Sequence, residues 1–151
     1  MKKFFPIFLL IIFLSGCGYS SIYKQNENIN FEILSLEIKG DKDINYLIER
    51  ELKQYIGVEN LRKFQVKINT KYSKDPILKD KTGKITKYKL IANLDLEFEI
   101  NNQIQNVSLN ETFNMENFND KFEEKKYELQ LKNNFSNLML NKIIPYLVNF
   151  E

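Results

Sequence analysis

The chain has no histidine, no tryptophan and only one cysteine, Cys17, among its 151 residues. Without histidine it cannot build a Ser–His–Asp or Cys–His catalytic arrangement, a histidine-ligated zinc site or the commonest general base. A single cysteine also rules out an internal disulfide bond. These absences favour binding over catalysis, and we expect no catalytic residues, no metal site and no cofactor.

The N-terminus has a pattern typical of exported proteins. Two lysines precede an almost unbroken apolar run over residues 4–14, which is the length of a signal-peptide apolar region and too short for the roughly 20 residues that span a membrane. The run ends in Leu-Ser-Gly-Cys, which resembles the lipobox of bacterial lipoproteins. We predict that residues 1–16 are a signal peptide, that cleavage falls between Gly16 and Cys17, and that Cys17 carries the lipid. A plain secretory signal or an N-terminal anchor helix would be the alternatives.

The residues after Cys17 predict where the mature chain resides. Gly18 follows, and not the aspartate that retains many lipoproteins at the inner membrane, so we expect a lipid anchor in the outer membrane, on its periplasmic side. Residues 17–30 are polar and aperiodic, and we interpret them as a lipidated N-terminus and tether that reaches about 45 Å at full extension. The mature chain carries 20 basic and 20 acidic residues, and because nucleic-acid binding rests on a basic footprint, we expect no nucleic-acid partner.

Residues 31–151 predict a single domain. Phe31–Lys39 is rich in Ile, Leu and Phe and indicates a strand, and apolar steps of three and four predict a helix over 43–56, capped by Asp41 or Asp43 and ended at Gly57. From Phe64 the period changes to two, which indicates a strand with one buried face. We expect the Asp75-Pro76 pair to break or bend that strand.

Further alternation predicts a long hairpin. Tyr88 to Ile100 alternates apolar and polar residues, Asn101-Asn102 suits the turn, and the returning strand holds Val107, Leu109 and Phe113 on one parity, with Glu111 interrupting that face. A final helix is expected from a cap at Asn117 or Asn119 to about Tyr146, kinked or ended by Pro145. Its predicted inward residues are Phe122, Leu131, Phe135, Leu138, Met139 and Leu147.

The order β-α-β-β-β-α predicts an α+β two-layer sandwich. About four mostly antiparallel strands would form the sheet, and the two helices would pack on one of its faces. The other face would stay open to solvent or to a partner.

Two groups of charged residues are candidates for function. Lys79, Lys81, Lys84 and Lys87, followed by Lys89, surround a turn at Gly83, where ammonium groups could meet phosphate or an acidic partner; a solvated loop is the plainer interpretation. Glu97 and Glu99 share one strand face, and paired carboxylates can serve hydrolysis. Exposed acids on a strand are far commoner, so we treat a carboxylate-dependent envelope hydrolase as the least favoured hypothesis.

Several of these features together resemble one family, the lipopolysaccharide-assembly lipoprotein LptE. Residues 14–23 (Leu-Ser-Gly-Cys-Gly-Tyr-Ser-Ser-Ile-Tyr) are similar to the start of such proteins, with an aromatic residue after Cys-Gly. Strand Phe31–Lys39, the helix that begins near Ile44, the long alternating pair after Tyr88 and the terminal helix also fit. The resemblance covers nearly the whole chain in size and order.

That resemblance implies a function and partners. Such lipoproteins sit as a plug within the outer-membrane β-barrel protein LptD, help it fold, and with it deliver lipopolysaccharide to the outer leaflet. For this chain the resemblance implies an LptD-like barrel and lipopolysaccharide as partners, with Lys79, Lys81, Lys84 and Lys87 as a positional hypothesis for lipopolysaccharide contact. A different envelope scaffold lipoprotein, with a periplasmic partner, is the alternative.

Lipidation of Cys17 is directly testable. Metabolic labelling with a fatty acid should tag the wild-type chain and leave the Cys17→Ser variant untagged, because only the cysteine thiol accepts the diacylglycerol. Equal labelling of the two chains would contradict the lipobox assignment.

Overall fold

The computed structural model describes residues 30–150. The predicted signal peptide at residues 1–16, the cleavage site at Gly16, the lipid site at Cys17 and all but the last residue of the 17–30 tether lie outside the described residues, and they stay predictions.

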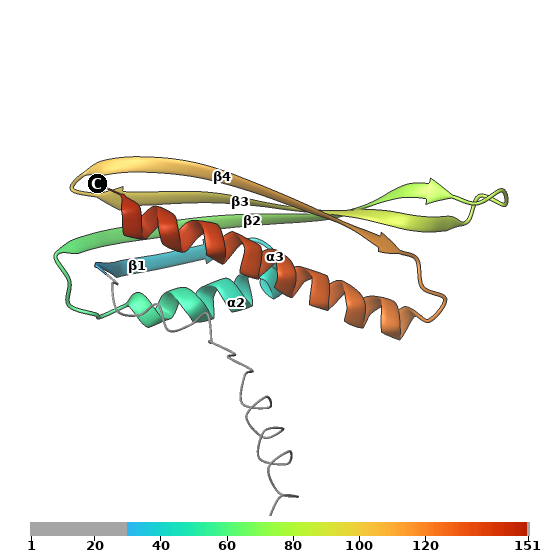
Figure 1. Ribbon diagram of the computed structural model, residues 1–151, viewed down its shortest axis with the longest axis horizontal. Coiled ribbons are helices and arrows are strands. Elements are labelled where there is room, and N and C mark those ends of the chain that lie inside the picture. The colour runs from blue at the N-terminus through green and yellow to red at the C-terminus, as the bar shows by residue number, and fades with distance from the viewer. Residues whose placement is uncertain (1–29, 151) are drawn as a thin grey trace, which may run out of the picture.

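The architecture is the predicted α+β two-layer sandwich (Figure 1). Its strands form one sheet in the order β1-β2-β3-β4, in which β1 runs parallel to β2 and the other neighbours are antiparallel. The helices contact each other and cover the same face of this sheet. The elements are β1 (Phe31–Lys39), α2 (Lys42–Leu52), the 3₁₀ turn η3 (Lys53–Tyr55), β2 (Arg62–Lys79), β3 (Ile85–Ile100), β4 (Gln103–Glu116) and α3 (Lys121–Asn149).

The alternation seen in the sequence produces a sheet with one buried apolar face and one exposed polar face. Apolar side chains of the two central strands point to the helices, and the intervening polar residues point the other way. The hairpin turn is also confirmed, since Asn101 and Asn102 both have positive φ, as a tight two-residue turn requires. The central strands bury Phe64, Val66, Ile68, Thr70, Leu90, Ala92, Leu94, Leu96, Phe98 and Ile100.

Of the break or bend predicted at Asp75-Pro76, the break does not occur in strand β2. The strand continues to Lys79, and only its pairing with β3 is irregular between Pro76 and Lys79. The reason lies in the neighbouring strand, because β1 ends opposite Asn69. Beyond that point β2 is an edge strand, and an edge tolerates a proline because the ladder needs no N–H on its free side. The β2–β3 hairpin is therefore long and projects past the other elements (Figure 1).

The sequence predicted the cap of α2 correctly and the cap of α3 wrongly. Asp41 caps α2 as predicted, since its Oδ1 accepts hydrogen bonds from the backbone N–H of Asp43 and Ile44 at 3.1 and 3.0 Å. The cap of α3 is Asp120 and neither Asn117 nor Asn119. Those two asparagines bind the hairpin: Asn117 Nδ2 donates to the Ile85 carbonyl, and Asn119 Oδ1 accepts from Lys84.

The two predicted helices also end differently from the sequence prediction. The predicted first helix divides into α2 and the short η3, after which Gly57 takes a positive φ. Pro145 does not end α3, which continues to Asn149. Its last carbonyls are capped by Arg62, whose guanidinium donates to Val148 O at 3.0 Å and also to Leu147 O. A cation at this end also opposes the helix dipole.

Two predicted inward residues of α3 point outward. Phe122 is 73% exposed and Leu138 is 37% exposed. The inward position near the start of α3 belongs to Glu124, which pairs with Lys74 of β2. The remaining predictions are confirmed, because Leu131, Phe135, Met139 and Leu147 are all buried.

Gly40 joins β1 to α2 and admits no side chain. Its φ is +110°, and an added Cβ would lie 1.9 Å from the Thr70 carbonyl oxygen. We expect Gly40→Ala to lower the free energy of unfolding by more than about 2 kcal/mol, because the strand backbone must shift. Gly83→Ala is the matched control, since Gly83 also has a positive φ but its added Cβ meets nothing within 4 Å, and it should cost about 1 kcal/mol. Urea unfolding measures both, and equal losses would contradict the steric account.

Candidate functional site

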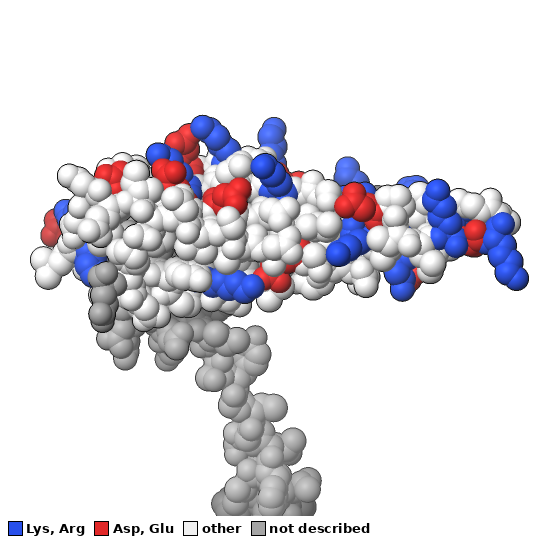
Figure 2. All heavy atoms as spheres, turned by 90° about the horizontal axis from the view of Figure 1, so that it is seen from above, with Lys and Arg blue, Asp and Glu red and all other residues white. Residues whose placement is uncertain are grey.

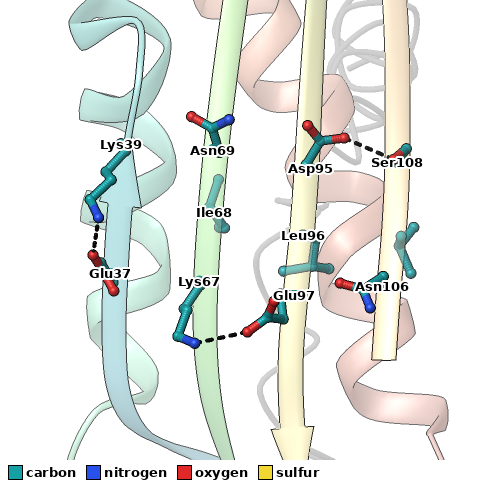
Figure 3. Close-up of a pocket in the computed structure, with 11 residues that line it drawn as sticks. Glu37, Lys39, Lys67, Ile68, Asn69, Asp95, Leu96, Glu97, Asn106 and Ser108 are labelled. Carbon is teal, nitrogen blue, oxygen red and sulfur yellow. Dashed lines mark hydrogen bonds and ion pairs between the residues drawn. The ribbon is translucent and has the colours of Figure 1, made fainter. Parts of the chain in front are cut away.

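The face of the sheet opposite the helices carries polar residues from all four strands (Figure 3). A shallow hollow of about 370 Å³ lies over its middle. Four of the five charged side chains that line it form ion pairs, since Lys67 Nζ lies 2.8 Å from Glu97 Oε1 and Lys39 Nζ lies 2.6 Å from Glu37 Oε1. The fifth, Asp95, accepts a hydrogen bond from the Ser108 hydroxyl at 2.8 Å. The carboxylate of Glu97 raises the pKa of Lys67, mainly through their hydrogen bond. This face is an exposed polar surface on which charges of both signs alternate.

That arrangement gives little support to carboxylate-dependent hydrolysis. Glu97 is held in its ion pair with Lys67, and Glu99 lies opposite Gln65 on the same open face. General acid catalysis by a carboxyl group needs a desolvated position that keeps it protonated. No group of potential metal ligands occurs in the part of the chain that the structure describes.

The predicted lysine turn is the tip of the β2–β3 hairpin. Its backbone is fastened by Asp80, whose Oδ1 accepts hydrogen bonds from the N–H of Thr82 at 2.8 Å and of Lys84 at 3.0 Å, and from the Thr82 hydroxyl at 2.6 Å. These bonds, with that of the hydroxyl the strongest, lower the pKa of Asp80. Asp80, which lies between Lys79 and Lys81 in the sequence, therefore stabilises the turn.

The structure brings the tip lysines together but gives them different surroundings. Lys87 pairs with Glu116 at 2.8 Å, and Lys84 donates to Asn119 Oδ1 at 3.2 Å. Lys79 and Lys81 are exposed and have no acidic partner among residues 30–150. Lysine side chains gather at the projecting end of the molecule (Figure 2). Lys79 and Lys81 are therefore the most available cations of the predicted set.

Two exposed apolar residues beside the tip were not among the predicted site residues. Ile77 is 47% exposed and Leu78 is 55% exposed. They follow Pro76, where the pairing with β3 shifts register and regular alternation is lost. A consecutive apolar pair inside a polar stretch was the available signal. The tip thus combines exposed aliphatic side chains with ammonium groups.

The hairpin is anchored to the first half of α3 by a charged cluster. Lys74 Nζ lies 2.8 Å from both Glu124 Oε1 and Glu128 Oε2, and the Tyr72 hydroxyl donates to Glu128 Oε1 at 2.7 Å. Although burial alone would raise the pKa of Glu124, the ammonium groups of Lys121 and Lys74 lower it to about 2. Burial and the neighbouring Glu128 carboxylate raise the pKa of Tyr72.

A second polar cluster fixes the two helices against each other. Lys132 of α3 lies 2.8 Å from Asp41 and 2.9 Å from Asp43, and its ammonium group stands 4.3 Å from the centre of the Tyr72 ring. Burial lowers the pKa of Lys132, but the two carboxylates outweigh it and raise the pKa above its ordinary value. The two charged clusters therefore fasten the β2–β3 hairpin to α3, and α3 to α2.

Among residues 30–150, no helix is long and apolar enough to cross a membrane.

Comparison with known proteins identifies the fold. No protein-family model matches the chain, and no curated protein matches it. The rare lipoprotein B of Shewanella oneidensis is similar in structure, with a TM-score of 0.57 and 12% identity over 76% of this chain and 97% of that one. A lipoprotein B from Nitrosomonas europaea has a TM-score of 0.49 and 10% identity over 84% and 93% of the two chains. A putative lipoprotein from Caulobacter crescentus has a TM-score of 0.49 and 8% identity over 76% and 88%. At these identities the likeness to the Shewanella protein shows a shared fold.

The charged cluster predicts a specific acid sensitivity. Because the folded-state pKa of Glu124 lies below its ordinary value of 4.5, at about 2, its contribution to stability is present above pH 5 and is lost as the pH falls towards 2. Glu124→Gln should reduce the difference in unfolding free energy between pH 7 and pH 3 by about 1 kcal/mol, after allowance for solvent screening.

Urea unfolding at several pH values measures this effect. Glu123→Gln is the matched control, since Glu123 is exposed and its contact with Lys126 is 3.9 Å long. The same change in pH dependence for both variants would contradict a special role for Glu124.

Proposed function

We propose that the protein is an outer-membrane lipoprotein that partners an LptD-like β-barrel, as a plug and assembly factor, in the transport of lipopolysaccharide to the outer leaflet. The observation that carries the proposal is the hairpin tip, which holds ammonium groups and exposed aliphatic side chains together. The family resemblance of residues 14–23, which include the lipobox, and the fold shared with a rare lipoprotein also support it.

The chemistry of the tip fits a phosphorylated lipid. Lipopolysaccharide carries phosphate groups next to acyl chains, so a surface that contacts it needs donors of positive charge beside apolar groups. Lys79 and Lys81 are cations without a described acidic partner, and Ile77 and Leu78 lie next to them in β2. Lysine meets phosphate as a point charge, which suits a ligand of variable geometry.

The rest of the molecule fits a binding role without chemistry. The chain has no histidine, and its two strand carboxylates lie on an open face, one of them in an ion pair. The Asp80 turn and the Lys74–Glu124–Glu128 cluster hold the projecting hairpin in place. A rigid projection loses little conformational entropy when it binds.

Partnership with a barrel has a direct test. A tagged full-length chain, purified from membranes in mild detergent, should bring down a large outer-membrane β-barrel protein in comparable amount. Recovery of a free monomer, or of a soluble periplasmic partner alone, would contradict the proposal, and the second result would favour the scaffold alternative.

Lipid contact at the tip has a separate test. The double variant Lys79→Glu/Lys81→Glu should reduce photo-crosslinking of the protein to lipopolysaccharide several-fold, because it reverses the two most available charges. Lys42→Glu/Lys71→Glu is the matched control, since it reverses two exposed charges on α2 and the middle of β2. Unchanged crosslinking in the tip variant, or an equal loss in the control, would contradict lipopolysaccharide contact at the tip.

A further inference from the structure

Strand β4 forms one edge of the sheet, and no described strand lies beside its free side. It is 14 residues long and pairs with β3 from Gln103 to Glu116 without a register shift. Its sequence contains no lysine, arginine or proline. Such an edge presents a regular row of backbone N–H and C=O groups to whatever lies alongside.

The other edges of this sheet are protected in the usual ways. Strand β1 has only nine residues, its pairing is irregular between Ile33 and Ser35, and Ile56 forms a bridge on its outer side. Beyond Asn69, the free edge of β2 contains Pro76 and register shifts. Bulges, proline, charge and short length are the devices by which proteins block unwanted strand pairing. Among the described edges, only β4 is long and free of bulges and proline, and its two charged residues, Glu111 and Glu116, are both held in ion pairs.

The two faces of β4 differ in character. On the open face the strand exposes an uncharged polar row of Asn106, Ser108, Asn110, Thr112 and Asn114. On the helix side, a groove of about 650 Å³ runs between the strand and the end of α3. The groove is lined by Leu109, Lys142, Pro145, Tyr146, Asn149 and Phe150.

The groove offers mainly apolar contact. Tyr146 is 48% exposed there, and the ammonium group of Lys142 is already paired with Glu111 of β4. Figure 2 views the molecule from the side on which β4 lies in Figure 1; charged side chains line the upper margin and the projecting end, and a few stand in the middle and near the lower edge. A strand placed beside β4 would thus meet apolar surface on one face and neutral polar groups on the other.

We propose that β4 accepts an extended β-segment of another protein, which adds a fifth strand to the sheet. The side chains of that segment alternate: apolar ones enter the groove beside Tyr146, and polar ones lie along the Asn and Ser row. Backbone hydrogen bonds supply affinity and the alternation supplies specificity, as in other cases of strand addition.

A second copy of this chain fits the edge less well. In a symmetric pair, β4 of one copy would present its own helix-side residues to the groove of the other. Beside apolar residues such as Leu109, these include the polar Gln103, Gln105 and Glu111, so a self-pair would also bury polar groups against apolar surface. A heterologous segment with apolar residues at those positions avoids this cost. The inference does not depend on the proposed role in lipopolysaccharide transport.

A synthetic peptide of alternating threonine and leucine provides the probe. It is added to the full-length chain in mild detergent, and backbone hydrogen exchange is followed. We expect the outward-facing amides of β4 to gain protection, while a peptide of the same composition with its leucines grouped together has no such effect. N-methylation along one edge of the alternating peptide should also abolish protection, because it removes the N–H donors.

A pair of tyrosine variants locates the contact. Tyr146→Glu should weaken peptide binding by about tenfold or more, as for loss of a buried aromatic contact. Tyr46→Glu, at an exposed tyrosine of α2, should leave binding unchanged. The proposal is overturned if the peptide fails to protect β4, if the grouped peptide binds equally well, or if the two variants bind alike. Concentration-dependent protection of β4 without peptide would identify a second copy as the occupant and would equally overturn it.

Discussion

The attachment of α3 to the sheet is the constraint on which the rest of the structure depends. Two basic side chains of β2 hold this helix to the sheet, Lys74 near its start and Arg62 at its end. In the middle its own Lys132 ties it to the start of α2 through Asp41 and Asp43. Between these points Phe135, Met139, Ile143 and Leu147 are buried against the sheet. Burial of such side chains supplies most of the stabilisation, at about 1.5–3 kcal/mol each. The buried ionic contacts fix where along the sheet the helix lies.

That placement decides which surfaces remain available to partners. Both helices pack on one face of the sheet. No described element covers the other face, the β4 edge or the β2–β3 tip. These surfaces differ in chemistry. The open face has paired charges, the edge offers backbone groups beside an apolar groove, and the tip joins cations to aliphatic side chains.

The sequence predicted the fold well where local patterns dominate. The first strand, the Asp41 cap, the Asn101-Asn102 turn and the lysine turn were all located from periodicity and turn chemistry. The predictions that were wrong concern residues whose conformation depends on contacts distant in the sequence. Pro76 is tolerated because β1 stops at the level of Asn69, and Phe122 faces outward because Lys74 draws Glu124 inward. Local patterns contain no information about such contacts, and for the same reason they could not reveal the groove beside β4, whereas Ile77 and Leu78 did leave a local signal as an apolar pair in a polar stretch.

The central claim is that the hairpin tip is a contact surface in the cell envelope. The most direct measurement places a photo-crosslinking amino acid at Thr82, within the tip turn, in the full-length chain in living cells. The account predicts crosslinks to lipopolysaccharide or to an outer-membrane β-barrel protein. Crosslinks only to soluble periplasmic proteins, or none while a crosslinker at Tyr46 on α2 reacts, would contradict it.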